Sequence, residues 1–244
     1  MTDIAPLDLT GVERVLVVTA HPDDVDFGFA GSVAQFTDAG IDVTYCIVTD
    51  GDAGGAETGV PREEMAPRRR EEQTKAASVV GVHDLRFLGY PDGRVESTLD
   101  LRRDISRVIR DVRPHRVMAQ SPERNWDRIY AGHPDHLAVG EATICAVYPD
   151  ARNRWAHPEL EREGWEPWAV DEVWIGAGVG GVTHYVDITT SIDRKIDALL
   201  SHKSQLPDPV ATGEMVRGWT TMIATSAGLP EGRYAEAVRV VGTR

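Results

Sequence analysis

The chain has 244 residues, which fits one large domain, and 41% of them are hydrophobic, enough to form a buried core. Its formal net charge is -13, with 26 Lys and Arg against 39 Asp and Glu, so the composition lacks the basic surface that nucleic acids and anionic membranes select. The N-terminal segment lacks a basic region followed by an apolar one, and no apolar run approaches the ~18 residues of a membrane span. We therefore expect a cytoplasmic protein that acts on a small molecule.

Short β-branched runs alternate with helical stretches along the first half of the chain. The predicted strands are Arg14–Thr19, Asp42–Thr49, Asp84–Leu88 and Arg116–Ala119. The predicted helices between them are about Ser32–Asp38, Arg62–Val80 and Leu99–Val112. Strand-helix-strand units at this spacing predict an α/β fold, a single Rossmann-like domain over residues 1–244 with a mostly parallel sheet and helices on both faces.

The second half of the chain is less regular. From about Asp150 to Ala169 it is rich in Trp, Pro, Glu and Arg without a clear period, which predicts an elaborated loop. Two strands and one helix are predicted after it, at Glu172–Ile175, Thr183–Ile188 and Ile192–Ser204. Both cysteines, Cys46 and Cys145, lie in apolar stretches and are interpreted as small buried hydrophobic residues, not as a disulfide or a catalytic thiol.

A group of ionisable residues follows the first predicted strand, in Ala20-His-Pro-Asp-Asp24. Charged groups at the exit of a buried strand are unfavourable unless something binds them. His21 and Asp24, three residues apart around a turn, could converge on one cation, and this would leave Asp23 free to take a proton.

A second group, Gly132-His-Pro-Asp-His136, follows the fourth predicted strand and repeats the His-Pro-Asp core. One further His from it would complete a set of two His and one carboxylate with an open position for water, as hydrolytic zinc sites have. Imidazole and carboxylate ligands together suit Zn2+ better than magnesium or calcium, although Fe2+ or Co2+ could take its place. Both groups lie at the carboxyl ends of strands, where ligands bind in parallel sheets.

These two motifs resemble the paired signatures of the PIG-L/LmbE-like zinc-dependent N-acetylglucosaminyl deacetylases. Further agreements span nearly the whole chain: Thr49-Asp-Gly-Asp52 with Gly54, Arg68 with Glu72 and Ala76, Phe87-Leu-Gly-Tyr90, His202-Lys-Ser-Gln205 and Tyr234-Ala-Glu-Ala237. The resemblance implies hydrolysis of the N-acetyl amide of an N-acetylglucosamine-type saccharide or glycoconjugate. It leaves open the acyl group, the sugar, the aglycone and assembly into a homo-oligomer.

The resemblance also implies roles for particular residues. Zinc would be held by His21, Asp24 and His136. Asp23 would be the general base that deprotonates the metal-bound water, and His133 would stabilise the oxyanion and protonate the leaving amine. Asp135 would orient His133.

One departure from the family concerns a Tyr that some of its sugar deacetylases have two residues before the second catalytic His. That place is Ala131 here, with Tyr130 one step earlier, so the sequence leaves open whether Tyr130 substitutes. Asp26 is interpreted as an acid at a helix N-terminus rather than a fourth ligand. The candidates for substrate contacts, which could equally be surface charges, are Asp52, Arg68, Asp127 and Arg128. The histidines outside the motifs, His83, His115, His157, His184 and His202, are assigned structural or surface roles.

Three alternatives remain at this point. An amidase acting on a glucosaminyl thiol conjugate would use the same residues. A magnesium-dependent phosphatase would use Asp24 as its nucleophile, but its mechanism has no role for His21, His133 and His136. A nucleotide-binding module is disfavoured because the glycine pattern after the first strand is not G-x-G-x-x-G.

Overall fold

A seven-stranded sheet forms the centre of the protein in the computed structural model, which describes residues 8–55, 59–126, 129, 132–176 and 181–244. The strands stand in the order β3-β2-β1-β4-β5-β7-β6. Their bounds are β1 Arg14–Thr19, β2 Asp42–Thr49, β3 Asp84–Tyr90, β4 Arg116–Ala119, β5 Glu172–Gly176, β6 His184–Asp187 and β7 Ala235–Gly242. The expected α/β fold with a mostly parallel sheet is confirmed.

The direction of the strands places the ligand-binding edge of the sheet. Strands β1 to β5 pair in parallel, whereas β7 runs antiparallel to both β5 and β6. The chain builds outward from β1 to β2 and β3 on one side and, after a crossover, from β4 to β5 on the other. The point of reversal therefore lies between β1 and β4, and open α/β sheets bind ligands at the carboxyl ends of the strands flanking such a point.

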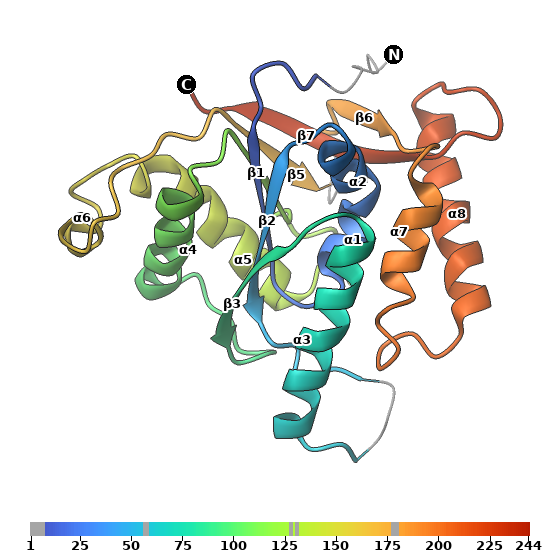
Figure 1. Cartoon of the computed structure of the whole chain (residues 1–244), viewed down its shortest axis with the longest axis horizontal. Helices are drawn as coiled ribbons and strands as arrows, with labels where there is room; N and C mark the ends of the chain where they lie inside the picture. The colour runs from blue at the N-terminus through green and yellow to red at the C-terminus, as the bar shows by residue number, and fades with distance from the viewer. Residues whose placement is uncertain (1–7, 56–58, 127–128, 130–131, 177–180) are drawn as a thin grey trace.

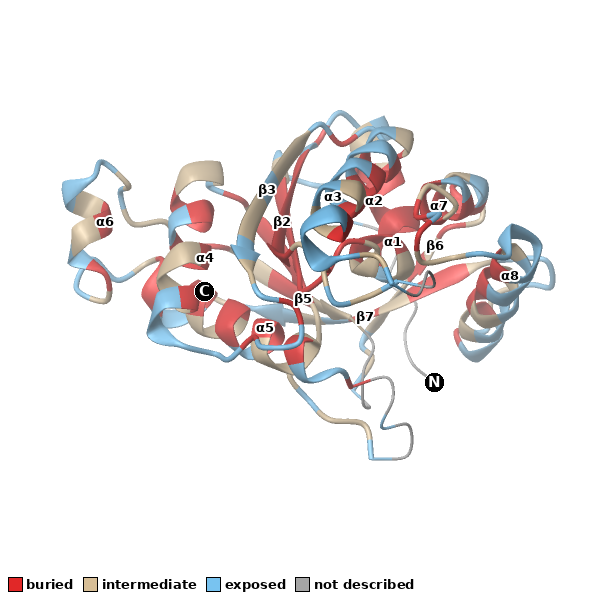
Figure 2. Ribbon diagram, turned by 90° about the horizontal axis from the view of Figure 1, so that it is seen from below, coloured by how far each residue is buried: buried red, intermediate tan, exposed pale blue. Residues whose placement is uncertain are grey.

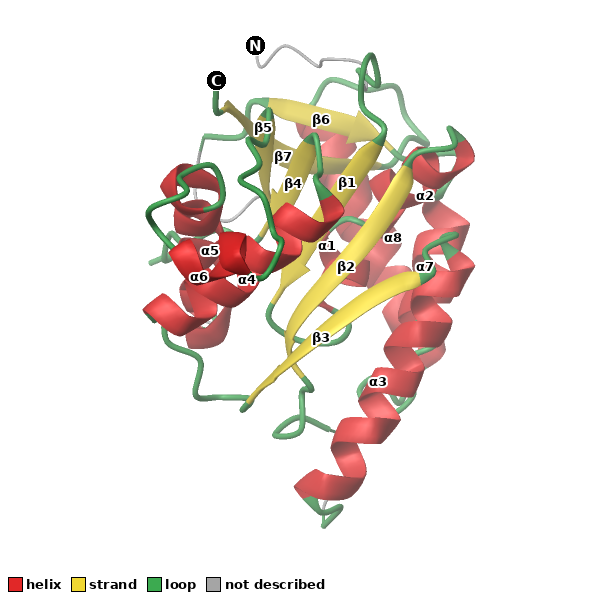
Figure 3. Cartoon of the chain, turned by 60° about the vertical axis from the view of Figure 1, so that its left-hand side comes forward, coloured by secondary structure: helices red, strands yellow, loops and turns green. Residues whose placement is uncertain are grey.

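Helices cover both faces of the sheet (Figures 1 and 3). Helices α2, α3, α7 and α8 contribute to one hydrophobic core, and α4 and α5 contribute to a second core on the opposite face. The helix bounds are α1 Asp24–Gly28, α2 Ala30–Asp38, α3 Arg62–Val79, α4 Leu99–Val112, α5 Pro134–Cys145, α6 Pro158–Arg162, α7 Ile192–Leu199 and α8 Pro209–Ser226. A π-helical turn, Ala146–Asp150, continues α5.

Coverage on both faces explains the apolar sequence of the central strands. Residues Val15 to Val18 of β1 are at most 1% exposed, which leaves no polar face, and Figure 2 shows the buried centre of the sheet. The edge strand β3 is only half-buried. Among the described helices, none is both long and apolar enough to cross a membrane.

The structure differs from the predicted elements mainly at α5, for which no bounds are predicted, and after residue 150. The expected loop contains the short helix α6, and the expected helix at 192–204 ends as α7 at Leu199. Beyond it, α8 and β7 have no predicted counterpart. In the sheet, β7 lies between β5 and β6. The chain forms α7 and α8 after β6 and then returns to the sheet as β7.

Candidate metal centre

Two loops at the reversal point of the sheet bring the sequence motifs together. His21 and Asp24 leave the end of β1, where α1 begins at Asp24. The second motif begins α5, with His133 as its N-cap. Pro134 fits the first helical position because an N–H there has no carbonyl partner within the helix, so proline loses no hydrogen bond. Gly140 holds α5 against the end of β4, since a Cβ there would lie 2.6 Å from the carbonyl oxygen of Gln120.

Three side chains from these loops converge on one point. His21 Nδ1 lies 3.1 Å from His136 Nε2 and 3.2 Å from Asp24 Oδ2. Asp24 Oδ1 lies 3.0 Å from His136 Nε2. A tetrahedral zinc ion with ligands at ~2.0–2.1 Å separates its ligand atoms by about 3.3 Å. The separation of the two imidazole nitrogens fits this value, and each nitrogen has a different carboxylate oxygen of Asp24 at a similar distance. The donors are two imidazoles and one carboxylate, which suits a divalent transition metal.

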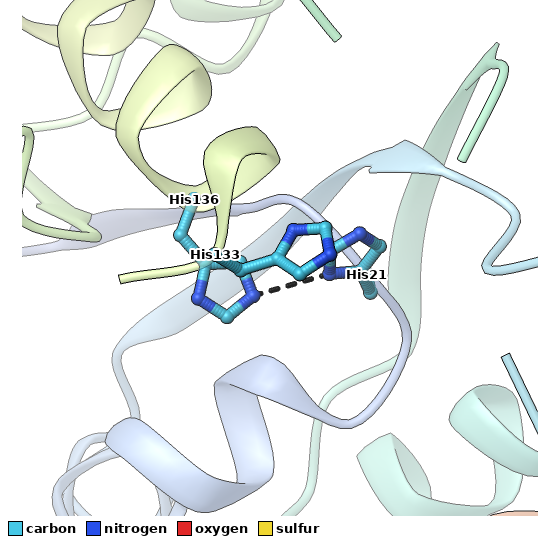
Figure 4. Close-up of side chains that lie close together, drawn as sticks. All are labelled: His21, His133 and His136. Atoms are coloured by element: carbon cyan, nitrogen blue, oxygen red, sulfur yellow. Dashed lines mark hydrogen bonds between the residues drawn. The ribbon is translucent and has the colours of Figure 1, made fainter. Parts of the chain in front are cut away.

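His133 completes the histidine cluster. Its ring centroid lies 4.9 Å from that of His21 and 5.3 Å from that of His136, and the three rings face one another in Figure 4. Nitrogens of the three rings lie close enough to share one ion. The geometry therefore offers His133 either beside the ion or, as the family resemblance implies, beside a reacting group.

The far side of the His21 ring is held by carboxylates. Its Nε2 lies 3.1 Å from Asp92 Oδ1 and 3.2 Å from Asp135 Oδ2, so this nitrogen carries the proton and leaves the Nδ1 lone pair for a metal. Burial lowers the pKa of His21, but hydrogen bonds to Asp24 and Asp92 outweigh it and raise that pKa to about 10, so a metal binding at Nδ1 would displace a proton from that nitrogen. Burial raises the pKa of Asp92, whereas His21 brings it down to about 2.

Asp23 is separated from these ligands by its own backbone turn and contacts Arg69 of α3. Arg69 Nη2 donates to Asp23 Oδ2 at 2.9 Å and to the carbonyl oxygen of Pro22 at 2.6 Å. Burial, with the neighbouring Asp24, raises the pKa of Asp23 to about 6 against the opposing charge of Arg69. Gly51 makes room for this arginine, because a Cβ at its φ of 63° would collide with the guanidinium.

Charge also sets the states of Asp24 and His133. Burial alone would raise the pKa of Asp24, but the charges and hydrogen bonds of His136 and His21 hold it well below its usual range. The pKa of His133 is lowered by burial and by His21 and His136. Its Nδ1 accepts from the Asp135 N–H at 3.2 Å, so in the neutral ring the proton lies on Nε2.

The carboxylate of Asp135 lies on the His21 side of the site, and its role in orienting His133 stays a prediction. Its carboxylate accepts from the backbone N–H groups of Gly93, at 2.7 Å, and Val95, at 3.2 Å, and faces His21. Its contact with His133 is made by the backbone N–H. Through this arrangement the loop after β3 is tied to the start of α5 and to the ring of His21.

Of the four predicted substrate contacts, the structure describes two, Asp52 and Arg68. Asp52 pairs with Arg62 and accepts from the Asp92 N–H at 3.2 Å, so it supports the loop after β3. Arg68 lies 3.8 Å from Glu72 and lines a groove between α3 and α7. Their contact with substrate stays a prediction. The remaining residues named from the sequence, Asp127, Arg128, Tyr130 and Ala131, lie outside the described part of the chain.

Sequence reasoning missed two residues of the site, Asp92 and Arg69. Asp92 follows β3 at the same edge of the sheet as both motifs, and that position was a usable signal. Arg69 stands four residues after Met65 and four before Gln73, on the buried side of α3. Because half of the buried residues of α3 are polar, hydrophobic periodicity does not reveal this face of the helix.

Two further sequence assignments concern Asp26 and His202. Asp26 is in the first turn of α1, as expected, but its side chain is fully buried. Its Oδ2 lies 2.8 Å from Nε2 of His202, which is also fully buried. His202 therefore has a structural contact behind the metal loop.

The fold and the site together define the class of this protein. It is an α/β protein whose Rossmann-like sheet has a candidate metal site, a cluster of His and Asp, at the reversal point of the strand order. Residues 16–147 match the PIG-L family model, described as GlcNAc-PI de-N-acetylase. The chain is 34% identical over 231 residues to diacetylchitobiose deacetylase of Thermococcus kodakarensis, which covers 94% of this chain and 84% of the relative. The chain therefore belongs to the PIG-L family, and the resemblance inferred from the motifs is confirmed.

Other relatives extend this comparison. The probable N-acetyl-alpha-D-glucosaminyl L-malate deacetylase 2 of Bacillus subtilis is 32% identical over 201 residues, covering 79% of this chain and 83% of the relative. The structure of N,N'-diacetylchitobiose deacetylase from Pyrococcus horikoshii in complex with its inhibitor MPG has a TM-score of 0.87 to this chain. Its sequence identity is 25%, over 96% of this chain and 85% of that chain.

Proposed function

We propose that this chain is a zinc-dependent N-deacetylase that removes the acetyl group from an N-acetylglucosamine-type saccharide or glycoconjugate. The observation that carries the proposal is the convergence of His21, Asp24 and His136: the two imidazole nitrogens lie 3.1 Å apart, and each lies 3.0 to 3.2 Å from one carboxylate oxygen of Asp24. Family membership supports the reaction, and the deacetylases named above act on amino sugars by their names.

His21, Asp24 and His136 are the residues that would hold the ion. When bound, zinc lowers the pKa of a coordinated water toward ~7 and polarises the amide carbonyl. The tautomer of His21 supports this assignment, because Asp92 and Asp135 hold the proton on Nε2 and leave Nδ1 facing Asp24 and His136.

Asp23 is the general base in this proposal. A carboxylate with a pKa of about 6 is a stronger base than an ordinary aspartate and is still largely ionised at pH 7. Arg69 keeps the carboxylate in place and offers positive charge beside it. The base therefore takes a proton from the attacking water without leaving its hydrogen-bonded position.

His133 is the general acid and oxyanion donor in this proposal. Its Nδ1 is occupied by the Asp135 N–H, so Nε2 is the nitrogen that can donate. To act as the acid, the ring takes a second proton on Nδ1 and gives up the contact with the Asp135 N–H, and its lowered pKa then favours release of the Nε2 proton to the departing amine. Asp23 and His133 thus divide the two proton transfers that amide hydrolysis requires.

The proposal is tested by acetate release from a panel of N-acetylglucosamine conjugates, which includes diacetylchitobiose, a glycoside with an acidic aglycone and a glucosaminyl thiol conjugate. Protein loaded with Zn2+, Fe2+ or Co2+ is compared with protein treated with a chelator. We expect acetate release only with metal and restoration by metal after the chelator is removed. Activity that chelation does not change would contradict the proposal, as would magnesium-dependent release of phosphate from a sugar phosphate assayed beside a panel that releases no acetate.

A further inference from the structure

Asp23 has a backbone conformation that residues with a side chain rarely adopt. Its φ is 91° and its ψ is -29°, and among the described non-glycine residues only Arg113 also has a positive φ. The turn lets two adjacent carboxylates serve different partners, because Asp24 faces the histidines whereas Asp23 faces Arg69. Strained residues at functional sites keep their geometry only where surrounding groups hold them.

Gln73 of α3 holds the N–H side of this strained residue. Asp23 is the N-cap of α1, so its own N–H has no partner within the helix. Gln73 Oε1 accepts from that N–H at 2.8 Å. On the other side, the Asp23 carbonyl oxygen accepts from the N–H groups of Asp26 and Phe27 at 2.9 and 3.0 Å. The strained peptide is thus held between α1 and α3.

The orientation of the Gln73 amide is itself fixed. The side chain is fully buried, and its Nε2 donates to Asp26 Oδ2 at 2.9 Å. The same oxygen faces His202 at 2.8 Å. A carboxylate accepts and a backbone N–H donates, so only one of the two amide orientations satisfies both neighbours.

We propose that Gln73 is a positioning residue that keeps Asp23 in its left-handed conformation and so directs the Asp23 carboxylate for proton transfer. This inference rests on the proposed function, in which Asp23 is the general base. The side-chain hydrogen bonds of Gln73 go to Asp23 and Asp26, not to the candidate ligands. Loss of Gln73 therefore slows the chemical step while metal and substrate still bind.

The test replaces the amide by a side chain of similar size, Gln73→Met. The matched control is Gln35→Met, because Gln35 on α2 also donates through Nε2, here to the carbonyl oxygen of Asp187 at 2.7 Å, and so joins α2 to β6. We expect Gln73→Met to lower kcat by about 100-fold with unchanged KM and one bound metal per chain. Gln35→Met should keep the kcat of the unaltered enzyme.

A second measurement uses metal-free protein and needs no activity. Amide hydrogen exchange followed by NMR should show the Asp23 N–H exchanging at least ~10-fold faster in Gln73→Met and unchanged in Gln35→Met. Unchanged kcat and exchange would overturn the inference, as would an equal loss of kcat in both variants. Should Gln73→Met fail to fold, Gln73→Asn, one methylene shorter, is measured in the same way.

Failure of the proposed function has a separate signature. If the unaltered, metal-loaded enzyme releases acetate from no conjugate, the assignment of Asp23 as the base fails. The exchange measurement then still decides whether Gln73 holds Asp23, because that contact exists without metal or substrate.

Discussion

Replacing Asp135 by asparagine distinguishes two roles for this residue. The family resemblance implies that it orients His133, whereas the structure directs its carboxylate to His21 and to two backbone N–H groups, those of Gly93 and Val95. An asparagine has one acceptor oxygen for these three donors and turns its NH2 toward at least one of them. The unmatched buried donor costs about 1–3 kcal/mol of folding stability.

Loss of the carboxylate also loosens the ring of His21 and removes one of the two carboxylates, Asp135 and Asp92, that keep its proton on Nε2. Losing such a contact behind a metal ligand weakens metal affinity by roughly 10- to 100-fold, or about 1.4–2.7 kcal/mol. Competition with a chromophoric chelator measures the Kd for zinc, and kcat is measured separately at saturating zinc. We expect the Kd to rise by that factor.

The matched control is Asp150→Asn. Asp150 is also a buried aspartate beside a histidine, at 3.4 Å from His157, but it lies with Arg102 at the far end of α5. This variant should lose stability and keep the zinc Kd. The reasoning is refuted if Asp135→Asn leaves the zinc Kd unchanged while kcat falls about 100-fold, since the carboxylate would then act through His133.

Further predictions concern catalysis, stability and pH. Asp23→Ala or His133→Ala should lower kcat by about 100-fold or more while zinc stays bound, as steady-state rates and metal analysis would show; unchanged rates would remove those roles. Glu236→Ala should lower the free energy of unfolding by about 3–5 kcal/mol in urea titrations, because Lys195, fully buried 2.7 Å from Glu236, loses its counter-charge; a loss below ~1 kcal/mol contradicts this. Burial raises the pKa of Cys46 from 9.0 to about 12, so the folded state holds the thiol proton more tightly than the unfolded state does. The contribution of Cys46 to the free energy of unfolding is therefore fully present below pH 9 and is lost as the pH rises toward 12. The unfolding free energy should fall by up to about 1.4 kcal/mol per pH unit more in the parent than in Cys46→Ala, and equal slopes would contradict the assignment.

The sheet could be predicted where its strands are buried on both faces. The expected bounds of β1, β2 and β4 agree with the structure because continuous apolar runs end at polar turns. Strand β7, Ala235–Gly242, has a mixed burial pattern and pairs with β5, distant in sequence, so no local pattern marks its antiparallel direction. Helix α8 combines scattered Thr and Gly with few charges, which gives a weak helical period.

The candidate site could be predicted as far as its motifs are local. His21 and Asp24 share one turn, and the parallel sheet brings His136 to them, so their convergence followed from spacing and topology. The side-chain partners of Asp135 and Asp23 depend on how the β3 loop and α3 pack over that edge. Such contacts depend on tertiary packing, and the sequence of one chain does not show which residues of α3 and of the loop after β3 will face the site.

The hydrogen-bonded pairing of β1 with β4 has a consequence for the rigidity of the metal site. Val18 stands opposite Ala119 in this ladder, so the stems of both metal-binding loops are fixed by neighbouring backbones. Gly140 lets α5 approach Gln120 at the end of β4, so the helix that carries His136 is fixed to the same pair of strands. A substitution that separates β1 from β4 should therefore move His21 away from His136 and weaken metal binding.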